Sequence, residues 1–266
     1  MNASKPQKKS ANWYEVKESH NSFGLTLIFA LLKLFPAVIV RALAFPVGFF
    51  YWLFGKKSRA VSSLYLEKIK AIKTQQGTSF KISTLKHVLS FAITLTEKVE
   101  VWANKFSFKQ IYFQDDDVKD MIKNLEEDKG VMVFISHLGN SELLRGLAHS
   151  GETGVSKQFV VNAIADVGVT SKFNGLLKKI NSSATMHLFN ASGIGPDTMV
   201  QLQEKIAAGE MVVIAGDRIS ATSKNRFVDA PFLGHTAHFA YGAFLLAALL
   251  NAPTYFIFGQ IGRAHV

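Results

Sequence analysis

VMVFISHLGNSELLRG, residues 131–146, contains the pattern that decides the fold. The apolar run 131–136 has the length of a buried strand, and a histidine, a Gly-Asn turn and an apolar helix from about residue 141 follow it. Residues five apart point to different faces of a continuous helix, so His137 and Glu142 cannot meet on one helix. A strand-loop-helix corner can bring them together at the carboxyl edge of a sheet, where open α/β folds place their sites.

Four more short β-rich runs follow the same plan. They are FVVNAIA (159–165), TMHLF (185–189), MVVIAG (211–216) and TYFIFG (254–259). Helical stretches separate them: TSKFNGLLKKI after the first, PDTMVQLQEKIAAG after the second, and a loop with TAHFAYGAFLLAALL after the third. This alternation predicts an α/β fold, a mostly parallel (mixed) sheet flanked by helices. Within SGIGPDT, Pro196 suits the first turn of a helix, so we interpret that stretch as a helix start.

The beginning of the chain is apolar and basic. Residues 1–22 are polar, which predicts a mobile N-terminus, and residues 23–54 read FGLTLIFALLKLFPAVIVRALAFPVGFFYWLF. Up to residue 59, nine basic residues stand against Glu15 and Glu18, which places +7 of the net charge of +10 in this region. Basic residues beside an apolar stretch suit an anionic membrane surface. We therefore predict that residues 23–57 form N-terminal hydrophobic, membrane-associated helices.

The way in which this segment meets a bilayer stays open at the level of sequence. A spanning helix needs about 20 apolar residues with few charges, whereas Lys33, Pro36, Arg41 and Pro46 interrupt the stretch. A single span, an interfacial or re-entrant hairpin, and a buried pair of core helices are the three alternatives.

Composition excludes several classes of protein and site. An apolar content of 48% argues against disorder, and the absence of cysteine excludes disulfides, thiolate metal sites and a cysteine nucleophile. Outside residues 1–59 the balance is 21 basic to 18 acidic residues, so we predict no nucleic-acid partner. No GxSxG elbow, P-loop or HExxH is present. His235 and His238 lack further ligands, so we predict no metal and no cofactor.

The pair His137 and Glu142 is the remaining candidate for chemistry. His137 would act as a general base near neutral pH, and Glu142 would fix its tautomer and stabilise the imidazolium. A carboxylate in a first helical turn is also favoured by the helix dipole, and a histidine at a strand end can be purely structural. The residues alone leave both interpretations open.

Two blocks of the sequence resemble a known family. HLGNSE resembles the H-x-G-N-x-E form of the His-x4-Asp/Glu motif of the lysophospholipid acyltransferase superfamily, in its lipid A lauroyl/myristoyl acyltransferase-like branch. VVIAGDRISAT, followed by FLGHTAHFAYGAFLLAALLNAPTYFIFG, resembles the second signature of that branch, a strand ending in Gly-Asp-Arg or Gly-Asp-Gln and a Phe-x-Gly turn. The resemblance runs from about residue 12 to residue 260. It departs at 238–242, where the family usually carries a proline-rich segment, which leaves acceptor contacts there open.

The resemblance implies a membrane-associated acyltransferase of lipid biosynthesis with a glycerol-3-phosphate acyltransferase-like fold over residues 58–260. Such an enzyme would move an acyl group from an acyl carrier protein thioester, or less readily from coenzyme A, to a hydroxyl of a lipid or glycolipid acceptor. His137 would be the catalytic base and Glu142 would hold it, and no protein nucleophile is required. Four further residues would bind substrate: Asn140, Arg145, Asp217 and Arg218.

The same resemblance implies a place in the cell and a partner. The location would be the inner (cytoplasmic) membrane of a bacterium, with the catalytic domain facing the cytoplasm. Acyl carrier proteins are acidic, so Lys172, Lys178 and Lys179 would help to dock one. The rival interpretation is a non-catalytic, membrane-bound lipid-binding or scaffold protein of the same fold. Residues 261–266, IGRAHV, match the translation of a common sequencing-adapter read, so we expect them to be a non-native tail on a truncated domain.

Overall fold

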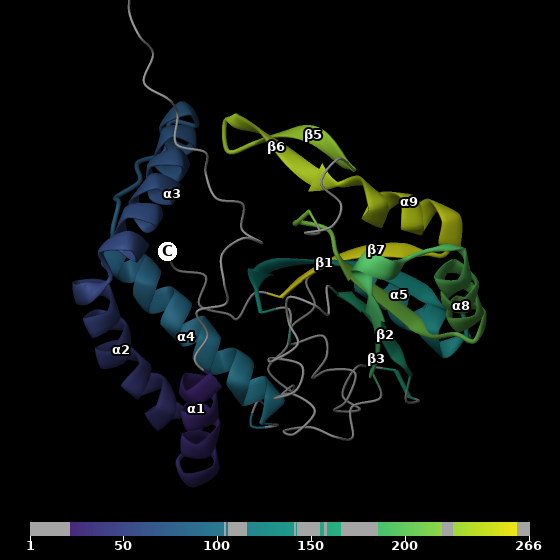
Figure 1. Ribbon diagram of the computed structural model, residues 1–266, viewed down its shortest axis with the longest axis horizontal. Coiled ribbons are helices and arrows are strands. Elements are labelled where there is room, and N and C mark those ends of the chain that lie inside the picture. The colour runs from purple at the N-terminus through teal and green to yellow at the C-terminus, as the bar shows by residue number, and fades with distance from the viewer. Residues whose placement is uncertain are drawn as a thin grey trace, which may run out of the picture.

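The described part of the chain comprises residues 22–103, 105, 116–140, 142, 155–156, 159–165, 186–219 and 226–259 of a computed structural model (Figure 1). Its first four helices pack against one another on one side of the molecule, and a sheet with its own helices lies on the other side. These helices are α1 (Ser22–Leu34), α2 (Ala37–Phe54), α3 (Lys56–Gln75) and α4 (Thr84–Trp102).

The sheet has five strands in the order β3-β2-β4-β1-β7. The strands are β1 (Val131–Gly139), β2 (Val161–Ala165), β3 (Met186–Asn190), β4 (Met211–Ala215) and β7 (Thr254–Gly259). All neighbouring pairs in this sheet run parallel. The predicted α/β class with its parallel sheet is confirmed. Among the described residues, antiparallel pairing occurs in a separate hairpin of β5 (Phe227–Phe232) and β6 (His235–Ala240).

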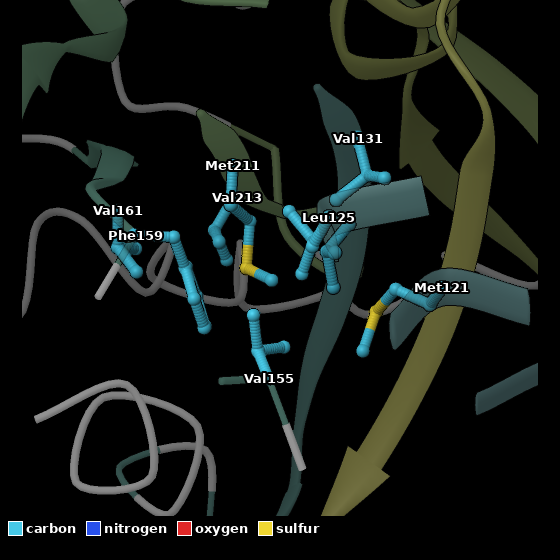
Figure 2. Packing of buried hydrophobic residues seen from close by; sticks show 9 residues of the cluster. Met121, Leu125, Val131, Val155, Phe159, Val161, Met211 and Val213 are labelled. Atoms are coloured by element: carbon cyan, nitrogen blue, oxygen red, sulfur yellow. The ribbon is translucent and has the colours of Figure 1, made fainter. Parts of the chain in front are cut away.

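Apolar side chains cover both faces of the sheet, as buried parallel strands require. On one face, Val131 and Val133 of β1 pack with Met121 and Leu125 of α5 (Asp116–Glu126), as Figure 2 shows for part of this cluster. On the other face, Met132 and Phe134 pack in a cluster with residues of α8 (Pro196–Ala207) and α9 (Tyr241–Leu250). Helix α8 starts at Pro196, which confirms the predicted helix start.

The expected helix TAHFAYGAFLLAALL is wrong in its first five residues. Residues 235–240 form strand β6, and helix α9 begins only at Tyr241. Leu233 and Gly234 both have positive φ angles, 51° and 74°, and lie between the paired residues Phe232 and His235. Such a two-residue turn suits the twist of a β-hairpin, and it overrides the helical spacing of the sequence that follows. His235 and His238 are therefore strand residues, not the start of a helix.

The apolar N-terminal segment is split at Pro36 into α1 and α2. By length and composition, α2 is the one helix in the described part of the chain that could cross a membrane, although the core helix of a soluble protein can pass the same test. Only 17% of this helix is buried, where it packs on α4 through Val40, Ala44 and Gly48. So small a buried share argues against the alternative in which residues 23–54 form a buried core pair.

Candidate active site

The pairing of β1 with β4 ends at the carboxyl edge of the sheet, and β1 continues beyond it to Gly139. Ile135 and Ala215 are their last paired residues, and the N–H of Gly216 still donates to the carbonyl of Ile135 at 3.1 Å. A Cβ on Gly216 would lie 3.0 Å from the ring of Phe134, so a glycine lets the chain leave β4 close to β1. Two residues beyond Ile135, still within β1, lies His137, and Asp217 directly follows Gly216.

The carboxylate of Asp217 binds His137 at two points. The backbone N–H of His137 donates to Oδ2 at 2.8 Å, and Nδ1 of its ring lies 2.9 Å from Oδ1. Strand β4 ends at Ala215, so no further backbone carbonyl of β4 pairs with the N–H of His137. The carboxylate of Asp217 accepts this hydrogen bond instead. Main chain and ring of His137 are thus fixed by the same side chain.

This contact defines the protonation pattern of the pair. Burial raises the pKa of the Asp217 carboxyl, but the side-chain and backbone hydrogen bonds of His137, together with its charge, outweigh burial and leave the pKa below its ordinary value. Asp217 is therefore ionised at neutral pH and can only accept hydrogen bonds, so Nδ1 of a neutral His137 carries the proton. The lone pair then lies on Nε2, which is the tautomer that a general base needs.

A corner follows the histidine, as predicted from the sequence. Gly139 has a φ of 71°, and Asn140 is fully buried. Oδ1 of Asn140 accepts a hydrogen bond from the backbone N–H of Glu142 at 3.1 Å, and Glu142 is helical. Asn140 thus occupies the capping position of a helix start, where its oxygen satisfies a free N–H. Its Nδ2 is buried with no hydrogen-bond partner among the described residues.

The structure brings together two of the predicted site residues, His137 and Asp217, and makes Asp217 the carboxylate partner of the histidine. His137 and Asp217 lie in contact, and their side chains are 41% and 30% exposed, so a substrate can reach them. Glu142 was expected to hold His137 and fix its tautomer, and in the structure the carboxylate bonded to Nδ1 is that of Asp217. A carboxylate of Glu142 would therefore have to act on His137 from the Nε2 side. Arg218 directly follows Asp217 at the same edge.

Four predicted residues cannot be placed. Arg145, expected to bind substrate, and the expected docking residues Lys172, Lys178 and Lys179 lie outside the described residues. Residues 1–21 of the expected mobile N-terminus (1–22) and all of the expected non-native tail (261–266) also lie outside them.

The sequence interpretation missed two histidine–aspartate pairs. Asp217 was assigned to substrate, because the order of strands that puts β4 beside β1 cannot be seen from the residues; only the Gly-Asp at a strand end hinted at it. The second pair is Asp229 and His238, which lie opposite each other on the β5–β6 hairpin and are bonded through Nδ1 of the histidine. The ring centroid of Phe227 lies 4.0 Å from the ring centroid of His238.

Neither a metal site nor a known relative identifies the function of this site. Within the described ranges, no group of three or more histidine, aspartate or glutamate side chains is placed to hold a metal ion. A scan of the chain against protein-family models finds no match, and a search of curated proteins finds none either. The case for a function therefore rests on the geometry of His137 and Asp217 and on the resemblance of the two sequence blocks.

Proposed function

We propose that the chain is a membrane-associated acyltransferase similar to the lipid A lauroyl/myristoyl branch of the lysophospholipid acyltransferase superfamily. The proposal includes a glycerol-3-phosphate acyltransferase-like fold, of which the parallel α/β sheet is the coarser, observed part. The observation that carries the proposal is the double hydrogen bond between Asp217 and His137 at the carboxyl edge. It is the arrangement that presents a basic Nε2 to a substrate hydroxyl.

The proposed reaction is a direct acyl transfer with no covalent enzyme intermediate. Nε2 of His137 takes the proton of the acceptor hydroxyl as its oxygen attacks the thioester carbonyl. The C–S bond breaks, the proton passes from the imidazolium to the leaving sulfur, and an ester and a free thiol result. Asp217 stabilises the imidazolium that forms in between. The proposal also includes stabilisation of the oxyanion by backbone N–H groups near Asn140 and Ser141.

The donor is an acyl carrier protein thioester, or coenzyme A, and the acceptor is a hydroxyl of a lipid or glycolipid. Arg218 and Arg145 bind phosphate groups of donor or acceptor, since a guanidinium offers a paired set of donors to such an anion. Neither a cofactor nor nucleic acid takes part. The exposed apolar face of α2 associates with the cytoplasmic face of a bacterial inner membrane, where it meets a lipid acceptor.

A thiol-release assay tests this proposal with little background, because the chain contains no cysteine. Purified full-length protein is incubated with acyl–acyl carrier protein and extracted membrane lipid, and both the free thiol and the acylated lipid are measured. His137→Ala should lower the rate by about 10²- to 10⁴-fold, the usual contribution of a general base. His187→Ala is the matched control: it removes an exposed histidine from β3 and should leave the rate unchanged.

The rival interpretation, a non-catalytic lipid-binding or scaffold protein, predicts the opposite result in this assay. It expects lipid binding without thiol release in the wild-type chain. Full acyl-transfer activity in the His137→Ala variant would overturn the proposed mechanism, because the reaction would then not need this base.

A further inference from the structure

Helices α2 and α4 are held together by an ion pair in their interface. Nε of Arg41 donates to Oε1 of Glu100 at 2.7 Å, and Nη2 of Arg41 binds Oε2. Glu100 is fully buried. Around this pair the helices approach closely, since a Cβ on Gly48 would lie 3.0 Å from Leu89 and 3.2 Å from Ala92. Two helices joined in this way must lie at the same depth in any bilayer.

The side of α2 that does not face α4 is apolar and uncovered, and it takes up about half of the helix circumference. Val38, Val47, Phe50 and Phe54, which are spread over this side, expose 71%, 67%, 56% and 76% of their surface. So large an exposed apolar surface on one helix is typical of a site that contacts a membrane or another protein.

Helix α4 cannot accompany α2 across a bilayer. It carries Lys86 and His87 near its beginning and Glu97, Lys98 and Glu100 near its end. Only residues 88–96 separate the two charged groups, whereas a span needs about 20 apolar residues. Charged side chains at the bilayer centre are strongly unfavourable. A spanning α2 would have to leave α4 and break the buried ion pair.

Cations and aromatic side chains border the apolar face at both ends of α2. Lys33 precedes the helix, and Lys56 and Lys57 follow it. Arg59 lies over the ring of Trp52, 5.4 Å from its centroid, and donates to the last carbonyls of the helix, those of Trp52 and Leu53. Basic residues attract anionic headgroups, and tryptophan prefers the boundary between headgroups and acyl chains. This charge complementarity favours an anionic lipid surface as the covering phase.

We propose that α2 lies in the plane of one leaflet, with its outer face in the acyl-chain boundary and α4 on the aqueous side. The inference rests on the proposed membrane association and decides between the geometries that the sequence left open. Lys33 and Lys57 then lie on the same side of the membrane as the sheet, whereas a spanning α2 would place them on opposite sides.

Single cysteines test this arrangement in full-length protein, because the natural residues offer no competing thiol. The variants are Lys33→Cys, Lys57→Cys and, as a reference on exposed α5, Lys119→Cys. Each is expressed in cells, and sealed inner-membrane vesicles of both orientations are treated with a membrane-impermeant maleimide. All three cysteines should react in the same orientation. A Lys33→Cys variant that reacts only in the orientation opposite to Lys57→Cys would overturn the in-plane geometry in favour of a span.

Val47→Cys reports on the apolar face itself. In membranes it should be at least about tenfold less reactive toward the water-soluble reagent than Lys57→Cys, because the acyl-chain boundary excludes the reagent. Equal reactivity would overturn the inference. Flotation of the unaltered chain with vesicles of phosphatidylethanolamine and phosphatidylglycerol tests the underlying membrane association separately. A chain that does not float, and whose Val47→Cys is protected in a dimer in solution, would assign the face to a second copy and refute both proposals.

Discussion

Asp217 fixes His137 through both its backbone and its ring, with one carboxylate oxygen 2.8 Å from the histidine N–H and the other 2.9 Å from Nδ1. The two residues are 80 positions apart in the chain and meet because β4 lies beside β1. A histidine held at two points has one orientation and one tautomer. This relationship, not the spacing of His137 and Glu142, defines the candidate base.

The first prediction separates the roles of the two candidate carboxylates, Asp217 and Glu142. Asp217→Asn should lower the rate of acyl transfer by about 10²-fold or more, because an amide can donate to Nδ1 and so stabilise the tautomer with its proton on Nε2. Glu142→Gln should have a milder effect, since Asp217 still holds the ring. The measurement is kcat with acyl–acyl carrier protein, together with its pH profile, which a merely structural change at Asp217 would not shift. A larger loss in Glu142→Gln would return the orienting role to Glu142.

The second prediction concerns stability at acid pH. The pKa of Asp217 is lowered in the folded state, so its contribution to stability is present above the unfolded value, about 3.9 for aspartate, and is lost as the pH falls through the lower folded value. Wild type should therefore be more stable than Asp217→Asn at neutral pH, and the difference should shrink below about pH 4. Thermal unfolding of both proteins across this range measures it. A difference that stays constant with pH would show that the ionised carboxylate does not stabilise the fold.

The third prediction concerns the pair in the interface of α2 and α4. Arg41→Met leaves the fully buried Glu100 without its cation and should cost about 3–5 kcal/mol of unfolding free energy. The double variant Arg41→Met/Glu100→Leu should recover most of this loss, because apolar residues can replace a buried pair. Denaturant unfolding in a mild detergent gives the comparison. If the double variant is no more stable than Arg41→Met, the cost does not come from an unpaired buried charge.

The fourth prediction tests the contact between the start of β1 and the end of α8. A Cβ on Gly130 would lie 2.2 Å from the backbone oxygen of Ile206, so Gly130→Ala must displace one of the two elements. We expect a loss of about 1–3 kcal/mol, the usual cost of overpacking. Gly193→Ala is the matched control, because nothing lies within 4 Å of its added Cβ. Similar melting temperatures for the two variants would contradict the close approach.

Much of the fold follows from local sequence. The runs at 131–136 and 211–216 are almost entirely apolar, as strands covered by helices on both faces require, so the parallel α/β class was predictable. The run at 254–259 forms the edge strand β7, where Phe256 and Phe258 are exposed. The helix start at Pro196 and the corner after His137 depend on backbone preferences of a few neighbouring residues. The β5–β6 hairpin was missed because the positive φ angles at Leu233 and Gly234 outweigh the helical spacing after them.

The residue types of the candidate site were determined by the sequence, but their partnerships were decided by the tertiary structure. A strand-end histidine and a Gly-Asp after another strand are visible in the chain, whereas the lateral order of parallel strands is not, because strands far apart in sequence pair through backbone groups that all residues share. The partner of Arg41 is likewise not visible in the sequence. The sequence presents it as a cation in an apolar segment, and only the packing of α2 on α4 supplies the buried carboxylate of Glu100 that holds it there.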